Sequence, residues 1–229
     1  GINRFIIYDN HNCPDGNHIG PPRLINKNSN LKQLLHNQID SGSVILIEWA
    51  YPYLLKKSGL SGQTTQQNHS IYAFRNCKYI GLFDVDEYIN PQNHNNIDIL
   101  FNELIIKHNL NTNNFASFRL LCKFFNNPNN IPINGYNFLK IYDCDEKVKR
   151  GQYEKNFVLP KLVETYSVHM ITKAKHIENS YNAMFTIDPE LIFFNHYRYL
   201  NKKSRGKNIT GISDDSIKNL VNLLNLGNI

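Results

Sequence analysis

Three carboxylates lie together at the end of one apolar segment. Residues 79–83 (YIGLF) are hydrophobic and are followed at once by Asp84, Asp86 and Glu87. In an extended chain Asp84 and Asp86 project to the same face, where their like charges repel unless a proton or a cation lies between them. A divalent metal such as Mg²⁺ or Mn²⁺ suits these hard oxygen ligands. The alternative is a turn at the strand end whose acids cap the next segment, and the residues alone leave both interpretations open.

A second group of polar side chains follows another apolar stretch near the C-terminus. The stretch FFNHYRYL (193–200) carries His196, and a basic run follows it, with Lys202, Lys203, Arg205 and Lys207. A single histidine after aromatics is usually a core or surface residue, and a basic run is usually a solvated face. Together, however, an imidazole and several cations are suited to binding a metal and a phosphate. A metal-bridged diphosphate would need the acids of the first group and the cations of the second.

Apolar runs and helical spacing predict the elements that position these groups. Buried strands are expected at 4–10, 43–49, 79–85 and 115–125, and helices at 31–40, 66–76 and 97–108. This alternation of strand and helix is typical of a mostly parallel sheet with helices on its faces. In the less regular second half we expect short strands at 137–143, 157–164 and 191–200 and a C-terminal helix at 213–229. The prediction is one α/β domain over residues 1–229.

Composition excludes some classes of protein and favours others. The net charge of +6 and the isoelectric point near 9.0 favour anionic partners. The four cysteines form no CxxC pair, so a zinc site is not expected. No apolar run approaches the roughly 20 residues of a membrane span. Because the chain begins with Gly1 rather than Met, we expect a preceding segment. That segment could carry a targeting or anchor sequence, so the sequence predicts no cellular location.

Three stretches together resemble a known group of enzymes. FIIYDNHNCPDG (5–16), QQNHSIYAFRNCKYIGLFDVDEYINP (66–91) and NHYRYLNKKSRGK (195–207) are similar, in this order, to the landmarks of GT-A glycosyltransferases. The resemblance is strongest to glycosyltransferase family 92 and related family 2-like proteins, and it covers most of the chain. It implies a GT-A fold, that is, a Rossmann-like and mostly parallel sheet, with the family's N-terminal segment absent.

The same resemblance assigns roles to individual residues. It implies that Asp86 and His196 bind a metal, with Asp84 beside them on the ribose or on metal-bound water. It places Asp9 and Asn10 at the base and ribose of a nucleotide, and places Lys203, Arg205, Gln67 and Lys161 elsewhere on the donor. The chain departs from the family pattern at two points. Asp9 and Asp15 are spaced more widely than usual, and Ser70 stands where alanine is usual.

The expected activity is transfer of a sugar from a nucleoside diphosphate sugar, of the UDP or GDP type, to a hydroxyl of a glycan or protein-linked acceptor. Inversion at the sugar is expected, with Mn²⁺ as cofactor and Mg²⁺ as the alternative, because a mixed carboxylate and imidazole shell favours Mn²⁺. An inverting enzyme needs a base. The sequence identifies none, although Glu164 and Asp145 are candidates; Glu87 is expected to orient the metal site.

Other functions fit the sequence less well. A haloacid-dehalogenase-like phosphatase needs Thr or Val where Tyr88 stands. A two-metal nuclease would need a further pair of acids at strand ends, and RNA binding would need exposed aromatics among the basic residues. We therefore expect no nucleic acid partner. The alternative that stays open is a non-catalytic module of the same fold that binds a nucleotide sugar or a glycan.

Overall fold

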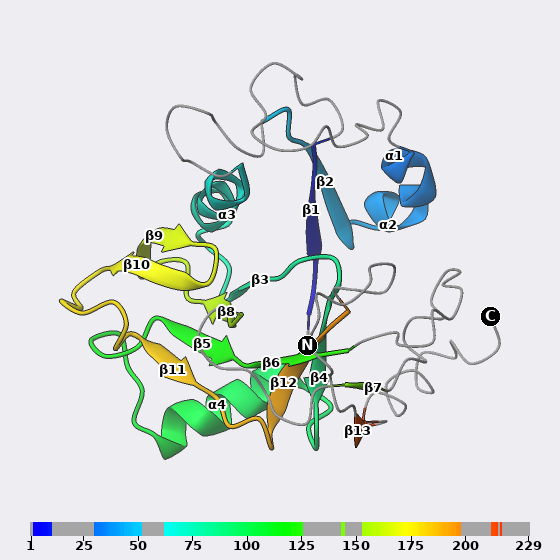
Figure 1. Cartoon of the computed structure of the whole chain (residues 1–229). Helices are drawn as coiled ribbons and strands as arrows, with labels where there is room; N and C mark the ends of the chain where they lie inside the picture. Colours follow the sequence, from blue (N-terminus) through cyan, green and yellow to red (C-terminus); the bar gives the residue numbers. More distant parts are fainter. Residues whose placement is uncertain are drawn as a thin grey trace, which may run out of the picture.

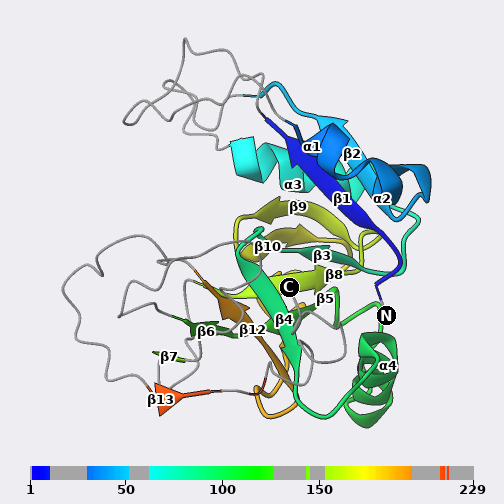
Figure 2. The ribbon, with the colours of Figure 1, turned by 90° about the vertical axis from the view of Figure 1, so that its right-hand side faces the viewer.

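The computed structural model describes residues 2–10, 30–51, 62–125, 143–144, 153–197, 212–214 and 216. Its helices in these ranges are α1 (Leu31–Leu34), α2 (His36–Asp40), α3 (Gly62–Ala73) and α4 (Ile97–Lys107). Figures 1 and 2 show them among several small sheets. None of the helices in the described part of the chain has the length and apolar character that a membrane span requires.

The central sheet has four strands in the order β11 (Met184–Thr186), β5 (Ser117–Leu120), β8 (Lys155–Val158) and β3 (Ile80–Leu82). It is a mixed sheet, because β8 runs antiparallel to both of its neighbours while β11 is parallel to β5. The acids of the first polar group follow β3 directly, so this sheet determines where they lie.

A second sheet has three strands in the order β4 (Glu87–Pro91), β12 (Ile192–His196) and β6 (Cys122–Phe124). β12 is antiparallel to β4 and parallel to β6. Its last residue, His196, is opposite Glu87 on one side and Phe124 on the other. Pairing of β12 with β4 therefore joins the two polar groups that are far apart in the sequence.

The other strands form pairs. β1 (Phe5–Asp9) and β2 (Val44–Glu48) are parallel, with α1 and α2 in the connection between them. Two further pairs are antiparallel: β9 (Val163–Ser167) with β10 (Met170–Ala174), and β7 (Asp143–Cys144) with β13 (Ile212–Ser213). Figure 1 shows β1 and β2 apart from the four-stranded sheet, with α3 and the β9–β10 hairpin to one side of them.

The predicted mostly parallel, Rossmann-like GT-A sheet is wrong for this structure. The only parallel pairs among the described strands are β1 with β2, β11 with β5 and β12 with β6. Strand β3 does not extend the β1–β2 pair but lies against β8, from the second half of the chain. The alternation of strand and helix predicted parallel neighbours, but β8 lies between β3 and β5 and makes both contacts antiparallel.

Individual elements were predicted better than their pairing. The helices expected at 31–40, 66–76 and 97–108 correspond to α1 with α2, α3 and α4, although α3 starts four residues earlier, at Gly62. The single strand expected at 115–125 is two strands, β5 and β6, that belong to different sheets. The strand expected at 157–164 is also wrong, since β8 ends at Val158 and β9 begins at Val163. Residues 137–142 and nearly all of the expected C-terminal helix lie outside the described residues.

Two hydrophobic clusters cover opposite faces of the four-stranded sheet. On one face α4 contributes Leu100, Phe101 and Leu104, and Phe101 stacks on Phe118 with ring centroids 4.2 Å apart. On the other face the cluster includes residues of α3, β9 and β10, with Tyr166 fully buried. Figure 2 shows this layering, with α3 and the hairpin on one side of β3, β8 and β5 and α4 on the other.

A half-buried side-chain contact attaches α3 to the β9–β10 hairpin. The Asn68 side chain donates to the carbonyl of Tyr166 at 2.7 Å and accepts from its N–H at 2.9 Å. A second donation, to the carbonyl of Thr64, fixes the amide on its own helix. Because one side chain satisfies both backbone groups of Tyr166, it fixes the position of α3, which in turn places Gln63 at the end of β3.

Gly81 is required by the close packing of β3 against β8. A Cβ at this position would lie 2.7 Å from Cε1 of Phe157 and 3.0 Å from Cε2 of Phe83. We expect Gly81→Ala to lower the free energy of unfolding by about 1–3 kcal/mol, as overpacking does. Urea unfolding measures this change. The double variant Gly81→Ala/Phe157→Leu should recover part of the loss; equal loss in both variants would show that the ring of Phe157 is not the cause.

Candidate functional site

The three acids lie on a tight turn between β3 and β4. The N–H of Glu87 donates to the carbonyl of Asp84 at 3.1 Å, and the N–H of Asp84 donates to Oε2 of Glu87 at 2.8 Å. Val85, at the tip, is 92% exposed. The segment is therefore a turn rather than extended chain, and Glu87 caps it as the second sequence interpretation expected. That capping engages Glu87 and leaves the carboxylates of Asp84 and Asp86 available for other contacts.

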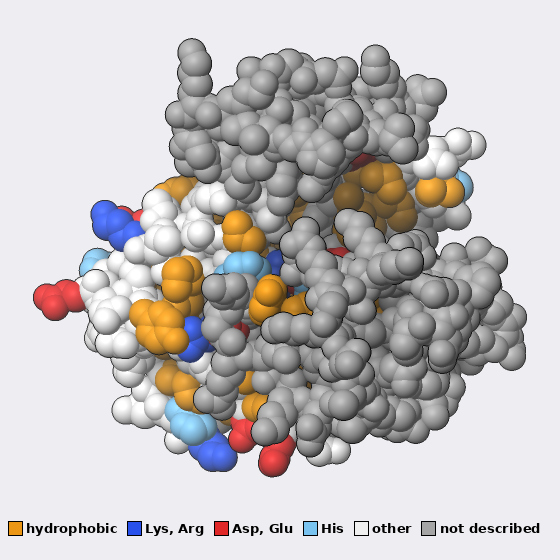
Figure 3. All heavy atoms as spheres, viewed as in Figure 1, with side chains coloured by type: hydrophobic (Ala, Val, Ile, Leu, Met, Phe, Trp, Pro, Cys, Tyr) orange, Lys and Arg blue, Asp and Glu red, His pale blue; other side chains and the backbone are white. Residues whose placement is uncertain are grey.

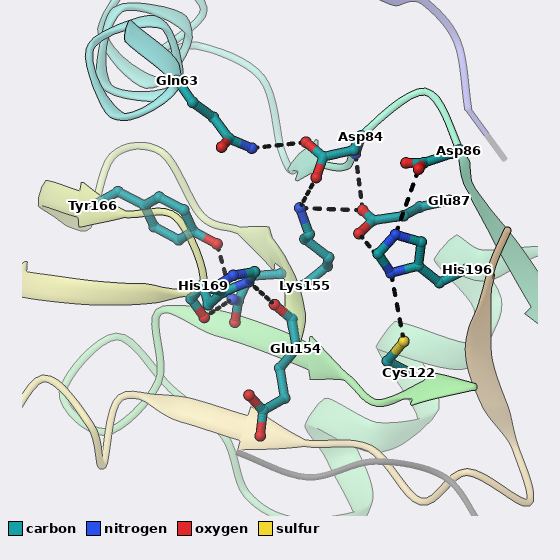
Figure 4. A network of polar contacts seen from close by, with 11 residues as sticks. Gln63, Asp84, Asp86, Glu87, Cys122, Glu154, Lys155, Tyr166, His169 and His196 are labelled. Atoms are coloured by element: carbon teal, nitrogen blue, oxygen red, sulfur yellow. Dashed lines mark hydrogen bonds and ion pairs between the residues drawn. The ribbon is translucent and has the colours of Figure 1, made fainter. Parts of the chain in front are cut away.

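A buried lysine that the sequence analysis did not identify organises two of these acids. Nζ of Lys155, on β8, lies 2.8 Å from Oδ2 of Asp84 and 3.2 Å from Oε2 of Glu87. The side chain of Lys155 is fully buried and that of Glu87 is 1% exposed. Gln63 of α3 completes the arrangement by donating to Oδ1 of Asp84 at 2.8 Å. Figure 4 shows Asp84 turned toward Gln63 and Lys155.

The third acid faces the late histidine. Oδ2 of Asp86 lies 3.5 Å from Nε2 of His196. The other ring nitrogen, Nδ1, lies 3.6 Å from Oε1 of Glu87 and 3.8 Å from Sγ of Cys122. The N–H of Tyr197 donates to the carbonyl of Asp86 at 2.9 Å, which fixes the turn against the end of β12. The strand register thus brings together Asp86 and His196 as the sequence analysis expected (Figure 4).

Burial and ion pairing give the acids different pKa values. The hydrogen bond with His196 lowers the pKa of Asp86, and this outweighs the effect of partial burial. Burial raises the pKa of Glu87, although Lys155 and the N–H of Asp84 oppose the shift. Asp86 therefore keeps its negative charge readily, and its side chain is 42% exposed.

The pair formed by Asp86 and His196 fits a divalent cation in part. One carboxylate oxygen and one imidazole nitrogen face each other, and a mixed shell of this kind suits Mn²⁺. Within the described residues no group of three or more His, Cys, Asp or Glu side chains is arranged for a metal ion. Asp84, which the sequence analysis also expected as a ligand, is engaged by Lys155 and Gln63. The described residues would thus supply two ligands, and cations that bind nucleotides commonly complete their shell with phosphate and water.

The expected nucleotide-binding residues are dispersed. Asp9 is buried at the end of β1 and Asn10 follows it exposed. Gln67 lies on α3 one turn after Gln63, and its Oε1 is buried without a hydrogen-bond partner among the described residues. Lys161 is exposed on the turn between β8 and β9, and none of the contacts among the described residues joins its side chain to the acids. Among these residues, Gln67 thus has a buried side-chain oxygen to which no described residue donates a hydrogen bond.

Other expected residues lie elsewhere. Lys203, Arg205 and Asp145 fall outside the described residues. Glu164, a candidate base, pairs instead with Lys173 at 2.7 Å, on a part of β9 and β10 that is open to solvent. Three residues near these acids were not predicted from the sequence, namely Gln63, Lys155 and His169, which Figure 4 labels in the same network of polar contacts. The available signal for Lys155 was its position two residues before Phe157, next to an apolar segment. A lysine that such a segment carries into the core needs an acid partner.

Removing the buried cation should destabilise the protein. We expect Lys155→Met to lower the free energy of unfolding by about 3–5 kcal/mol, because Glu87 would stay buried without a counter-charge. The matched control is Lys173→Met, which breaks the exposed pair with Glu164 and should unfold as wild type does, because solvent screens an exposed pair. Chemical denaturation measures both. Adding Glu87→Gln should restore much of the loss in Lys155→Met; equal stabilities of wild type and Lys155→Met would contradict the assignment.

Comparison with known proteins gives the family. The chain matches the model of glycosyltransferase family 92 over residues 24–223, which is most of its length and includes both polar groups described above. A search of curated proteins finds no match. Because the match covers far more than half of the chain, it is sufficient by itself to assign the family. The chain belongs to glycosyltransferase family 92 and is a glycosyltransferase.

Proposed function

We propose that the protein is a metal-dependent glycosyltransferase that uses a nucleoside diphosphate sugar and inverts the configuration of the transferred sugar. The observation that carries the proposal is the approach of Asp86 Oδ2 to His196 Nε2, at 3.5 Å, although the two residues are far apart in the sequence. A half-exposed carboxylate beside an imidazole is a suitable pair of ligands for Mn²⁺, with Mg²⁺ as the alternative.

Each side chain has a distinct part in this proposal. Asp86 and His196 would hold the cation, and Glu87 would orient the imidazole from the side of Nδ1. Asp84, held by Gln63 and Lys155, would face the ribose or the cation's water. The chemistry that a bound Mn²⁺ supplies is Lewis-acid stabilisation of the negative charge that develops on the leaving diphosphate.

The donor and the acceptor follow from the chemistry of the class. We propose a donor of the UDP or GDP type, bound with Asp9, Asn10 and Gln67 near its nucleotide, and a hydroxyl of a glycan or protein-linked sugar as acceptor. The net charge of +6 favours an anionic donor. Figure 3 shows Lys and Arg scattered among acidic and hydrophobic side chains on the described part of one face, without one continuous basic patch.

A donor panel tests the activity. The wild-type protein should hydrolyse, or transfer from, at least one of the common UDP and GDP sugars in the presence of Mn²⁺. Chelation with EDTA should abolish turnover, and added Mn²⁺ should restore it. Release of UDP or GDP measures the reaction. Turnover that survives EDTA would overturn the metal dependence, and a lack of both turnover and Mn²⁺-dependent nucleotide binding would overturn the proposal.

The two proposed ligands can be tested separately from turnover. We expect Asp86→Asn and His196→Gln each to weaken Mn²⁺-dependent binding of UDP or GDP at least about tenfold, a loss of about 1.4 kcal/mol or more. Isothermal titration calorimetry measures the affinity with and without Mn²⁺. Asp98→Asn, which changes an exposed aspartate at the start of α4, is the control and should bind as wild type does. Unchanged affinity in either ligand variant would refute that assignment.

A further inference from the structure

His169 is held rigidly beside the buried lysine. It lies in the turn between β9 and β10, where its Nδ1 is 3.0 Å from the carbonyl oxygen of Glu154. Its own carbonyl accepts from the side chain of Asn156 at 2.9 Å. One contact is to the residue that precedes β8 and the other is to the second residue of β8, so they lie on either side of Lys155 in the sequence. The ring therefore has a fixed position next to the residue whose Nζ reaches Asp84, as Figure 4 shows.

The contact to Glu154 also fixes the tautomer. A backbone carbonyl can only accept a hydrogen bond, so Nδ1 carries the hydrogen of the neutral ring and Nε2 keeps a lone pair. No described residue bonds Nε2, and the side chain is half-buried rather than enclosed. The ring thus offers one basic nitrogen whose orientation is set by the bond on its other side.

The charges around His169 keep this nitrogen unprotonated. Burial lowers the pKa of the imidazole, and the ammonium of Lys155 lowers it further. The bond to the Glu154 carbonyl and the carboxylates of Asp84 and Glu154 act in the opposite direction but are outweighed. Tyr166, the remaining titratable group nearby, is a neutral phenol whose pKa is raised by burial. At neutral pH His169 is therefore mainly in the form that accepts a proton.

We propose that His169 is the general base of the transfer reaction, an inference that rests on the proposed function. Nε2 takes the proton of the acceptor hydroxyl while the hydroxyl oxygen forms a bond to the anomeric carbon of the donor sugar. The bond from that carbon to the diphosphate oxygen breaks at the same time, and its electron pair leaves with the diphosphate. The neutral base becomes an imidazolium, and the proton later passes to solvent.

The nearby carboxylates are less suited to this role. Glu87 is buried and occupied by Lys155 and by the N–H of Asp84. Asp84 is bound at both oxygens, by Gln63 and Lys155. Glu164 pairs with Lys173 on the outer part of the hairpin. His169 is the group beside these acids that combines a fixed ring, a partial opening to solvent and a nitrogen without a partner among the described residues.

The substitution His169→Asn separates a catalytic role from a structural one. The amide N–H of asparagine lies near the place of Nδ1–H, so it can keep the bond to the Glu154 carbonyl while Nε2 is lost. We expect the kcat of sugar transfer to fall about 100-fold or more, the scale of general base catalysis. Mn²⁺-dependent binding of UDP or GDP and the unfolding midpoint should stay as in wild type. His176→Asn, at an exposed position with a φ of 60° that asparagine tolerates, is the matched control and should transfer normally.

The pH dependence supplies a second readout. The kcat of wild type should fall at acidic pH as Nε2 becomes protonated, and the residual activity of His169→Asn should lack this limb. Transfer by His169→Asn within a few-fold of wild type would overturn the role of His169. So would a parallel loss of transfer, nucleotide binding and stability in both His169→Asn and His169→Gln, which would show a structural role. Absence of transfer by the wild type with every donor would instead overturn the proposed function, and this inference with it.

Discussion

A charged ammonium group cannot be buried without anions beside it, and the centre of this protein is arranged around that constraint. Lys155 is fully buried in β8, so the chain must bring carboxylates to it. Asp84 and Glu87 do so because β3 pairs with β8 and ends at the turn that carries them. Glu87 is also opposite His196, so the same ion pair connects the four-stranded sheet to the three-stranded one. Strand pairing and charge compensation therefore specify the same geometry.

The sequence predicts elements of this fold but not their neighbours, for a physical reason. Apolar periodicity is a local property, and it located β1, β2 and α4 to within a few residues. Strand pairing is non-local: β8 lies between β3 and β5 in the sheet although it follows both of them in the sequence. Nothing in the residues of 115–125 indicates that the stretch divides at Leu121 and sends its halves to two sheets. The expectation of parallel neighbours failed for this reason.

The site was more predictable than the sheet that positions it. Asp86 and His196 have side chains whose chemistry is visible without a structure, and the strand register brings them together. Lys155 and His169 were missed because their environment, rather than their type, makes them important. A lysine is ordinarily a surface residue and a histidine in a turn is ordinarily solvated. The position of β8 between its neighbours shows that Lys155 is buried. The contact with the carbonyl of Glu154 shows that His169 has a fixed tautomer.

Three acids so close together would repel one another if they all faced the same point, and the fold avoids this by giving them different partners. The turn directs Asp84 and Glu87 toward the single positive charge of Lys155. Asp86 faces the other way, toward the imidazole of His196. Since two carboxylates share one ammonium, the cluster keeps an excess of negative charge, and the half-exposed Asp86 presents it to solvent. A divalent cation at Asp86 and His196 would neutralise that excess without disturbing the buried ion pair, which is why the metal and the lysine have complementary places in the proposed site.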